Sequence, residues 1–234
     1  MGCTEVDPQL PGGSNRLREG PGGGVPGTVL LVRPDRELGW NDALQASWES
    51  IDAPGVPGRV ARIDRGWSTV MRTATDDQPL RSRNLYVDVA IGDWVVVSDD
   101  GERIDHVIER TSAFVRRASF EGDRFEADAL AANIDVVFLV HALGSPPNQR
   151  RLERELVLAF DSGAEPVVLL TKVDTVDDPE PARAELAEVA LGVPVLLASG
   201  LAAIGIEPIR HYASGNRTLA FLGASGVGQI RVAV

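Results

Sequence analysis

The sequence predicts an α/β protein in which a small β-barrel precedes a parallel β-sheet flanked by helices. Residues 58–108 contain five short apolar runs separated by turn-forming segments, which is typical of a small antiparallel barrel. After Glu126, apolar runs alternate with helical stretches, as in a parallel sheet with crossover helices. We therefore expect three parts: a disordered tail with a short helix (1–54), the barrel (55–118) and an incomplete sheet domain (119–234).

The first part has little capacity to form a core. Residues 1–27 are rich in glycine and proline, so they cannot bury enough apolar surface to offset the entropy of ordering. We expect them to be disordered, as an over-extended start of the chain. A helix is expected over 37–50, with Asn41 or Asp42 as its N-cap.

The five runs of the second part predict a barrel of the OB type, closed or partly open. Such barrels often bind oligonucleotides, but a barrel with a purely structural role has the same pattern, and the runs favour neither role. The expected strands are 59–63, 67–71, 85–89, 93–97 and 104–108.

An arginine pair follows the barrel. Arg116 and Arg117 lie between Phe114 and Phe120. Arginine beside aromatic residues suits stacking on single-stranded RNA and contact with its phosphates. A linker with a solvated arginine pair explains the same residues at least as well.

The third part predicts a parallel sheet with a β-α-β-α-β-α-β order. The helix over 179–191 begins with acidic residues and a proline in its first turn, which is a typical helix start. The expected strands are 135–140, 166–170, 193–197 and 218–222, and the expected helices are 150–161, 179–191 and 204–212.

A Thr-Lys-x-Asp motif ends the second of these strands and carries the first functional signal. Open α/β sheets bind ligands at the carboxyl ends of their strands, where Thr171, Lys172 and Asp174 are expected. The Asp174 carboxylate can accept two N–H bonds from a guanine edge, and the Lys172 stem can lie along a purine face. Lys172 is the single lysine beside 22 arginines, which suggests a site where a planar guanidinium would not substitute. A helix-capping aspartate after a surface lysine is the plainer alternative.

A glycine-rich loop after the last strand gives the second signal. Its two glycines have the spacing of a phosphate loop, G-x-x-x-x-G-K-[ST], in which main-chain N–H groups converge on an anion. The next two positions should be a lysine and a hydroxyl residue, but they are Gln229 and Ile230. The predicted phosphate-binding residues are Gly223, Ala224, Ser225, Gly226, Val227 and Gly228.

Composition excludes several classes of protein. Residues 55–120 are neutral, with ten arginines and ten acids, whereas the remainder carries the whole net charge of −11. An RNA contact is therefore expected in the neutral segment. No apolar run is long enough to span a bilayer, and the N-terminus does not read as a signal peptide. Cys3 is the one cysteine, so a disulfide framework is excluded and no zinc cluster is expected. We expect a cytoplasmic protein that is a monomer and does not bind membranes.

In this chain the base-reading motif precedes the phosphate-reading motif, and a small barrel precedes both. This order resembles the circularly permuted GTPase family named ribosome small subunit-dependent GTPase A (RsgA). The resemblance covers about residues 58–228. It rests on Gly92-Asp93-Trp94-Val95, Ser112-Ala113-Phe114 with Arg116-Arg117, Ala131-Ala132-Asn133-Ile134-Asp135, Arg151-Leu152-Glu153-Arg154, Asp161-Ser162-Gly163-Ala164 and Pro166-Val167-Val168-Leu169.

The resemblance implies a protein that binds GTP and GDP, hydrolyses GTP when docked on the small (30S) ribosomal subunit with its 16S rRNA, and acts in maturation of that subunit. Thr171, Lys172 and Asp174 match the guanine-specificity motif, with threonine for the commoner asparagine. Ser199 and Gly200 match the segment that supports the base, where alanine is usual in place of the glycine. Residues 223–228 match the phosphate loop.

The family's Mg²⁺ ligands, its Asp-x-x-Gly switch and its zinc-binding region lie beyond the phosphate loop and have no counterpart in these residues. Hydrolysis is therefore left open, and no catalytic residue is assigned. If Gly228, Gln229 and Ile230 were encoded GGG-CAA-ATC, deletion of one G would restore Gly-Lys-Ser. We predict a frameshifted or truncated form of a longer GTPase, which resequencing of the gene in all three frames would test.

Two other interpretations remain. One is an RNA- or ribosome-binding module without catalysis, in which the barrel and the arginine pair act alone. The other is an inactive fragment, which would show as low solubility. A dinucleotide-binding enzyme is disfavoured because no acidic residue follows an early glycine-rich turn at the required distance. His106, His141 and His211 share no motif, so each is expected to be structural or solvated.

Overall fold

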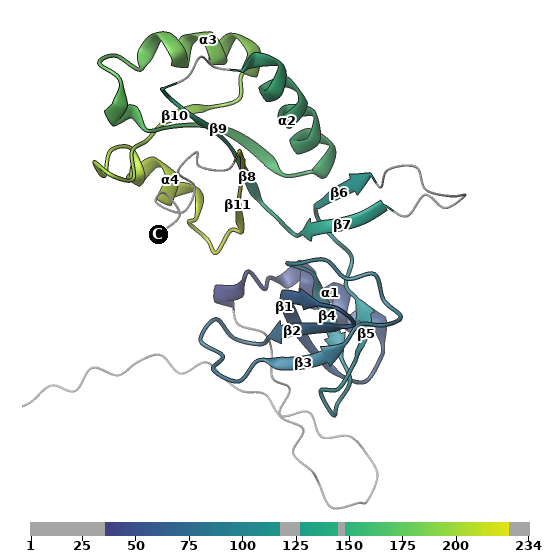
Figure 1. The fold of residues 1–234 in the computed structure, drawn as a ribbon. Helices are drawn as coiled ribbons and strands as arrows, with labels where there is room; N and C mark the ends of the chain where they lie inside the picture. Colours follow the sequence, from purple (N-terminus) through teal and green to yellow (C-terminus); the bar gives the residue numbers. More distant parts are fainter. Residues whose placement is uncertain (1–35, 118–126, 145–147, 225–234) are drawn as a thin grey trace, which may run out of the picture. The chain divides into compact units, whose positions relative to one another are not determined.

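The computed structural model describes residues 36–117, 127–144 and 148–224 (Figure 1). The tail predicted over 1–27 and Cys3 lie outside these residues, as does most of the glycine-rich loop. None of the helices in the described ranges is long and apolar enough to cross a membrane.

The N-terminal part of this structure is a five-stranded antiparallel sheet in the order β3-β2-β1-β4-β5. Its two outer strands, β3 and β5, are joined by a parallel bridge between Arg83 and Arg103, where Arg83 N donates to Glu102 O at 2.8 Å. Valines and an isoleucine from four strands form the core beneath this sheet. The strands are β1 (Val56–Asp64), β2 (Trp67–Met71), β3 (Leu80–Arg83), β4 (Trp94–Val97) and β5 (Ile104–Val107).

Helix α1 (Asp42–Ile51) packs on this sheet and follows a short 3₁₀ turn, η1 (Arg36–Leu38). Of the two possible N-caps, Asn41 is the observed one, because its side chain accepts from Leu44 N at 2.9 Å. Trp40 and Leu44 are buried against Trp94 of β4, and the Trp40 and Trp94 rings meet edge to face at 4.9 Å. The predicted helix over 37–50 is therefore confirmed from Asp42 onward.

One predicted strand is wrong. Residues 85–89 form no strand, and the third strand is β3, Leu80–Arg83. Ser82 is the one fully buried residue of β3 and donates to Gly101 O at 2.8 Å, so this strand carries a polar side chain at its buried position. Leu85 and Tyr86 are exposed instead. This segment is a loop, from which Val87 and Val89 still pack against the core of the sheet.

A hairpin that the sequence did not predict joins the two sheets. It pairs β6 (Ala113–Arg117) with β7 (Ala127–Ala132), and the register shifts between Phe114 and Val115. The alanine-rich β7 has no strand periodicity, so its pairing with β6 was hidden. Asn133 follows it with a left-handed backbone (φ 55°) and turns the chain toward the second sheet.

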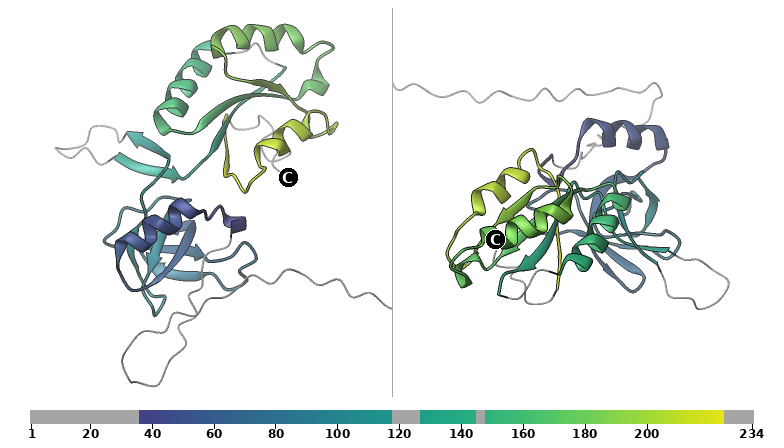
Figure 2. Two further views of the ribbon diagram at one scale, coloured as in Figure 1. Left: turned by 180° about the vertical axis from the view of Figure 1, so that it is seen from behind. Right: turned by 90° about the horizontal axis from the view of Figure 1, so that it is seen from above.

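The second sheet is parallel throughout, in the order β10-β9-β8-β11, which confirms the predicted alternation of strands and helices. Helices α2 and α3 cover one face and α4 covers the other (Figures 1 and 2). Its elements are β8 (Val136–Ala142), α2 (Gln149–Ser162), β9 (Glu165–Thr171), η2 (Val173–Thr175), α3 (Glu180–Ala190), β10 (Val195–Leu197), α4 (Ile206–Tyr212) and β11 (Leu219–Gly223).

Candidate functional site

The carboxyl edge of the parallel sheet brings the predicted base-reading segments and the start of the phosphate loop together. Ala142 of β8 is paired with Thr171 of β9, and Val140 of β8 is paired with Gly223 of β11. Leu197, at the end of β10, is paired with Leu170. Because all four strands end at this edge, the loops that follow β9, β10 and β11 share the position where parallel sheets bind ligands.

The turn after β9 is fixed by hydrogen bonds around Thr171 and Lys172. Thr171 is 1% exposed, and its hydroxyl lies 3.4 Å from the main-chain oxygen of His141 on β8. Lys172 has a left-handed backbone (φ 61°, ψ 36°), which is unfavourable for a residue other than glycine. Thr175 holds it there, because its N–H and hydroxyl both donate to Lys172 O, at 3.0 and 2.7 Å. Strain of this kind is concentrated at functional sites.

Asp174 and Ser199 are joined directly across two loops. The Ser199 hydroxyl donates to the Asp174 carboxylate and accepts from Ala202 N at 3.0 Å. Ser199 is buried, whereas Asp174 is exposed. A buried hydroxyl thus orients an exposed carboxylate, which has further lone pairs to accept N–H groups of a ligand. Gly200, the neighbouring predicted residue, is half-buried beside Ser199.

Only the beginning of the predicted phosphate loop is described. Gly223 is the last residue of β11, and Ala224 packs against the apolar cluster beneath α4. Ser225, Gly226, Val227 and Gly228 lie outside the described residues, as do Gln229 and Ile230. Their part in anion binding therefore stays a prediction.

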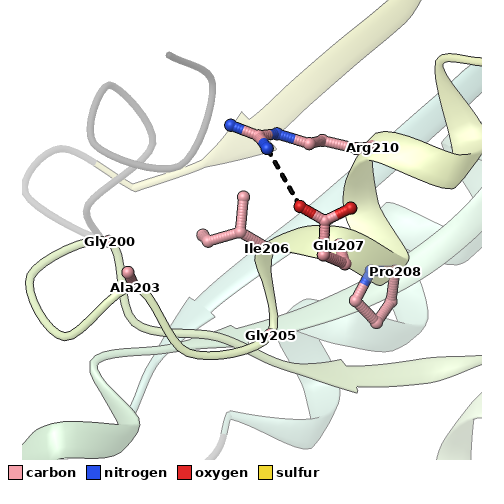
Figure 3. Close-up of a pocket in the computed structure, with 7 residues that line it drawn as sticks. All are labelled: Gly200, Ala203, Gly205, Ile206, Glu207, Pro208 and Arg210. Carbon is pink, nitrogen blue, oxygen red and sulfur yellow. Dashed lines mark hydrogen bonds and ion pairs between the residues drawn. The ribbon is translucent and has the colours of Figure 1, made fainter.

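A hollow of about 370 Å³ borders the base-binding segment (Figure 3). Ile206, Glu207 and Arg210 of α4 are drawn toward one another in Figure 3, and Arg210 Nη1 contacts Glu207 Oε1 at 2.9 Å. Both side chains of this ion pair are exposed. Its lining residues are Gly200, Ala203, Gly205, Ile206, Glu207, Pro208 and Arg210.

A buried cluster of ionisable side chains lies near the carboxyl end of β8. His141 Nε2 lies 2.9 Å from Glu155 Oε2, and Arg151 Nε donates to Glu155 Oε1 at 2.7 Å. Burial alone would raise the pKa of Glu155, but hydrogen bonds from His141 and Arg151 outweigh it and hold that pKa below its ordinary value. The cluster ties α2 to β8, and it gives His141 a structural role.

Arginine and tryptophan gather on the outer surface of β2 and β3, which sequence reasoning missed. Trp67 is paired with Arg83. The guanidinium of Arg81 lies 5.3 Å from the Trp67 ring centre, and that of Arg83 lies 4.9 Å from it. We call these three residues the arginine–tryptophan face. Only the pairing of β2 with β3 reveals this face, and the sequence analysis expected the third strand at 85–89 instead.

The predicted RNA-contacting pair, Arg116 and Arg117, lies at the end of β6, where its backbone is paired with Asp128 and Ala127 of β7. The direction of its side chains is outside the described part of the structure. Within the described ranges, no group of three or more histidine, cysteine, aspartate or glutamate residues could hold a metal ion.

Comparisons with known proteins agree on one family. The model of the RsgA GTPase family matches residues 107–230. A small ribosomal subunit biogenesis GTPase RsgA of Syntrophotalea carbinolica is 31% identical over 210 residues, covering 83% of this chain and 57% of that protein. The RsgA of Streptomyces coelicolor is 36% identical over 83% of this chain and 55% of its own length, and RsgA 1 of Listeria innocua is 41% identical over 77% and 53%. The chain thus spans just over half the length of these curated relatives.

Solved structures show the same fold. YjeQ from Thermotoga maritima matches with a TM-score of 0.58 and 21% identity, over 76% of this chain and 63% of that one. YloQ, a circularly permuted GTPase, matches with a TM-score of 0.52 and 24% identity, over 75% and 62%.

Proposed function

The chain belongs to the RsgA GTPase family, and from this premise we propose that it binds GTP and GDP at the carboxyl edge of its parallel sheet and acts in maturation of the small ribosomal subunit. The relatives that it matches are named small ribosomal subunit biogenesis GTPases.

The observation that carries the proposal is the Asp174–Ser199 contact. Guanine presents two adjacent N–H donors that a carboxylate can accept together, and the Ser199 hydroxyl holds the Asp174 carboxylate in one orientation. A purine without that pair of donors would leave the carboxylate unsatisfied, and sites built on such hydrogen bonds reject the wrong ligand strongly. Lys172, held in its left-handed turn, supplies the stem that covers the purine face.

Titration with fluorescent GDP, GTP and ATP tests this site. Asp174→Asn should weaken GDP binding by about 100-fold or more, because each hydrogen bond to a charged group is worth about 1.5–3 kcal/mol. Asp177→Asn is the matched control, since Asp177 is an exposed acid of the same loop, and it should leave the affinity unchanged. Equal affinity for GTP and ATP, or an unaffected Asp174→Asn variant, would contradict the proposal.

Hydrolysis depends on groups that these residues do not supply. A phosphate loop holds Mg²⁺ through a hydroxyl and the phosphates through a lysine, but this chain has Ile230 and Gln229 at those positions. Neither side chain can take over its part, so the residues present do not fit the metal ion. Zinc does not fit either, because Cys3 is the one cysteine. We propose nucleotide binding by residues 223–228 through main-chain N–H groups, and a GTPase assay with and without small subunits tests whether hydrolysis accompanies it.

We further infer that the N-terminal sheet is an OB-type barrel that contacts RNA, with 16S rRNA as the partner. The parallel bridge between Arg83 and Arg103 supports the barrel, because it links the outer strands of the five-stranded sheet. OB folds bind oligonucleotides on the face of their second and third strands, which is where the arginine–tryptophan face lies. Arg116 and Arg117 would extend this contact. This RNA-binding role is also the second candidate function, should the sheet bind no nucleotide.

RNA titrations at several salt concentrations test the contact. Arg81→Ala and Arg83→Ala should each weaken binding and lower the salt slope by about one unit. Arg183→Ala, which removes an exposed ion-paired arginine of α3, is the control. Unchanged slopes in both barrel variants would refute this face.

The remaining expectations are proposals of the same kind. We propose domain boundaries at 1–54, 55–118 and 119–234, a cytoplasmic location that follows from ribosome maturation, and a monomer. Light scattering after size exclusion tests the monomer, and limited proteolysis tests the boundaries.

A further inference from the structure

Arg59 of β1 makes an unusual set of contacts. Its guanidinium lies over the Trp94 ring, 5.3 Å from the ring centre, and donates hydrogen bonds to four separate segments of the chain. The acceptors are Leu38 O, Gly92 O at 3.3 Å, Asn133 O at 3.1 Å and Thr218 Oγ1 at 2.8 Å. One side chain therefore joins the turn before α1, the approach to β4 and the approaches to two strands of the parallel sheet.

Thr218 is the contact that matters most, because it directly precedes β11. Thr218 N donates to Asp135 Oδ2 at 2.6 Å, and Thr218 O accepts from Asp135 N at 3.0 Å. Asp135 in turn directly precedes β8. The amino ends of β8 and β11 are thus bonded to each other and to Arg59.

The carboxyl ends of the same two strands flank the proposed nucleotide site. β11 pairs with β8 along its whole length, from Leu219 opposite Val136 to Gly223 opposite Val140. At about 3.3 Å per residue, Gly223 lies about 16 Å from Thr218. This continuous pairing connects Thr218 to Gly223, the first glycine of the predicted phosphate loop.

The chemistry of Arg59 favours a role in orientation. Burial lowers its pKa, and the nearby charge of Asp135 only partly offsets that effect. Its four hydrogen-bond acceptors are three main-chain carbonyls and a hydroxyl, all neutral. The N–H donors of a planar guanidinium point in fixed directions, so its hydrogen bonds depend on the position of each acceptor. A lysine ammonium could not reproduce this arrangement of donors.

We propose that Arg59 is a positioning residue that links RNA binding on the barrel to the position of Gly223 at the nucleotide site, through Thr218 and β11. The proposal rests on the nucleotide and RNA sites proposed above. It predicts that RNA and GDP change each other's affinity by the same factor, because coupling between two binding sites is reciprocal.

The experiment measures this coupling factor in the whole chain. Fluorescent GDP is titrated with and without a single-stranded RNA of about 12 nucleotides, and the RNA is titrated with and without GDP. The unmodified chain should show a factor of about five or more. Thr218→Val removes only the β11 contact of Arg59 and should bring the factor to about one, with each separate affinity changed by less than about threefold. Arg59→Lys should do the same, and Arg62→Lys, on the exposed part of β1, should not.

Hydrogen exchange of the β11 amides supplies a readout that does not need the nucleotide. RNA should change the exchange of residues 219–223 in the unmodified chain and not in Thr218→Val. Coupling retained by both Thr218→Val and Arg59→Lys would overturn the proposal, as would binding of both ligands without coupling in the unmodified chain. If RNA changed the exchange of the β11 amides in a chain that does not bind GDP, the connection from Arg59 through Thr218 to β11 would be supported and the nucleotide site would be refuted.

Discussion

The carboxylate of Asp93, at the entry to β4, offers the sharpest test of how the N-terminal sheet is held together. Its side chain is 0% exposed. Arg110 donates to it twice, from Nε to Oδ1 and from Nη2 to Oδ2, both at 2.8 Å, and Ala90 N donates to Oδ2 at 2.6 Å. Three donors therefore converge on one buried group. The hydrogen bonds that Arg110 donates to Asp93 also raise the pKa of Arg110 above its ordinary value.

Replacement of Asp93 by alanine leaves two groups without their partner. Breaking a buried ion pair costs about 3–5 kcal/mol, and a buried N–H without an acceptor costs about 1–3 kcal/mol. The Arg110 side chain keeps 23% exposure, so water recovers part of this loss. We expect Asp93→Ala to lower the free energy of unfolding by about 3 kcal/mol. For a chain of this size that corresponds to a fall in Tm of about 6–12 °C.

Urea unfolding monitored by tryptophan fluorescence measures the effect, because Trp94 is buried beside Asp93. The control is Asp88→Ala. Asp88 also contacts Arg110, but at 3.5 Å and with a side chain that is 68% exposed. It should cost about 0.5 kcal/mol or less. If Asp93→Ala cost under about 1 kcal/mol, or no more than Asp88→Ala, the reasoning on buried charge would fail.

Two further predictions concern the sheet domain. Hydrogen bonds from His141 and Arg151 outweigh burial and lower the pKa of Glu155 from its ordinary value of 4.5. The stability that they add is therefore present above pH 4.5 and is lost as the pH falls through the lower pKa of the folded state. In urea unfolding at several pH values, Glu155→Gln should weaken this loss of stability at acid pH, and an unchanged pH dependence would contradict the prediction. Gly205→Ala should lower the free energy of unfolding by more than about 2 kcal/mol in thermal unfolding, because the added Cβ would lie 1.9 Å from a carbonyl oxygen and φ is +69°. Gly192→Ala is the control: its φ is +93° but the space around it is open, so it should cost only about 1 kcal/mol.

The parallel sheet was predictable because its two central strands, β8 and β9, are buried on both faces. Such strands appear as continuous apolar runs, as in β9, where every residue after Glu165 is buried. The helices between them carry a clear apolar face. Pattern and structure therefore agree on the identity of every strand and helix in this sheet, with bounds that differ by at most two residues.

The N-terminal sheet and the β6–β7 hairpin were less predictable because their strands include short and partly polar ones. In β3 the inward position is Ser82, which is satisfied by a hydrogen bond rather than by apolar packing. In β7 alanine replaces the branched residues that favour strands. Exposed Leu85 and Tyr86 then supplied a false strand signal nearby. Apolar periodicity reports burial, so it fails where hydrogen bonds take over that role.

The same distinction separates the predicted from the unpredicted parts of the site. Thr171, Lys172 and Asp174 are close enough in sequence to form a motif, and they lie at the end of β9, as predicted. The Asp174–Ser199 contact spans 25 positions and the Arg59–Thr218 contact spans 159. Neither leaves a local pattern, because each depends on which strands lie side by side. Motifs can therefore indicate what a site binds, whereas the groups that orient its residues become visible only once the register of the sheets is known.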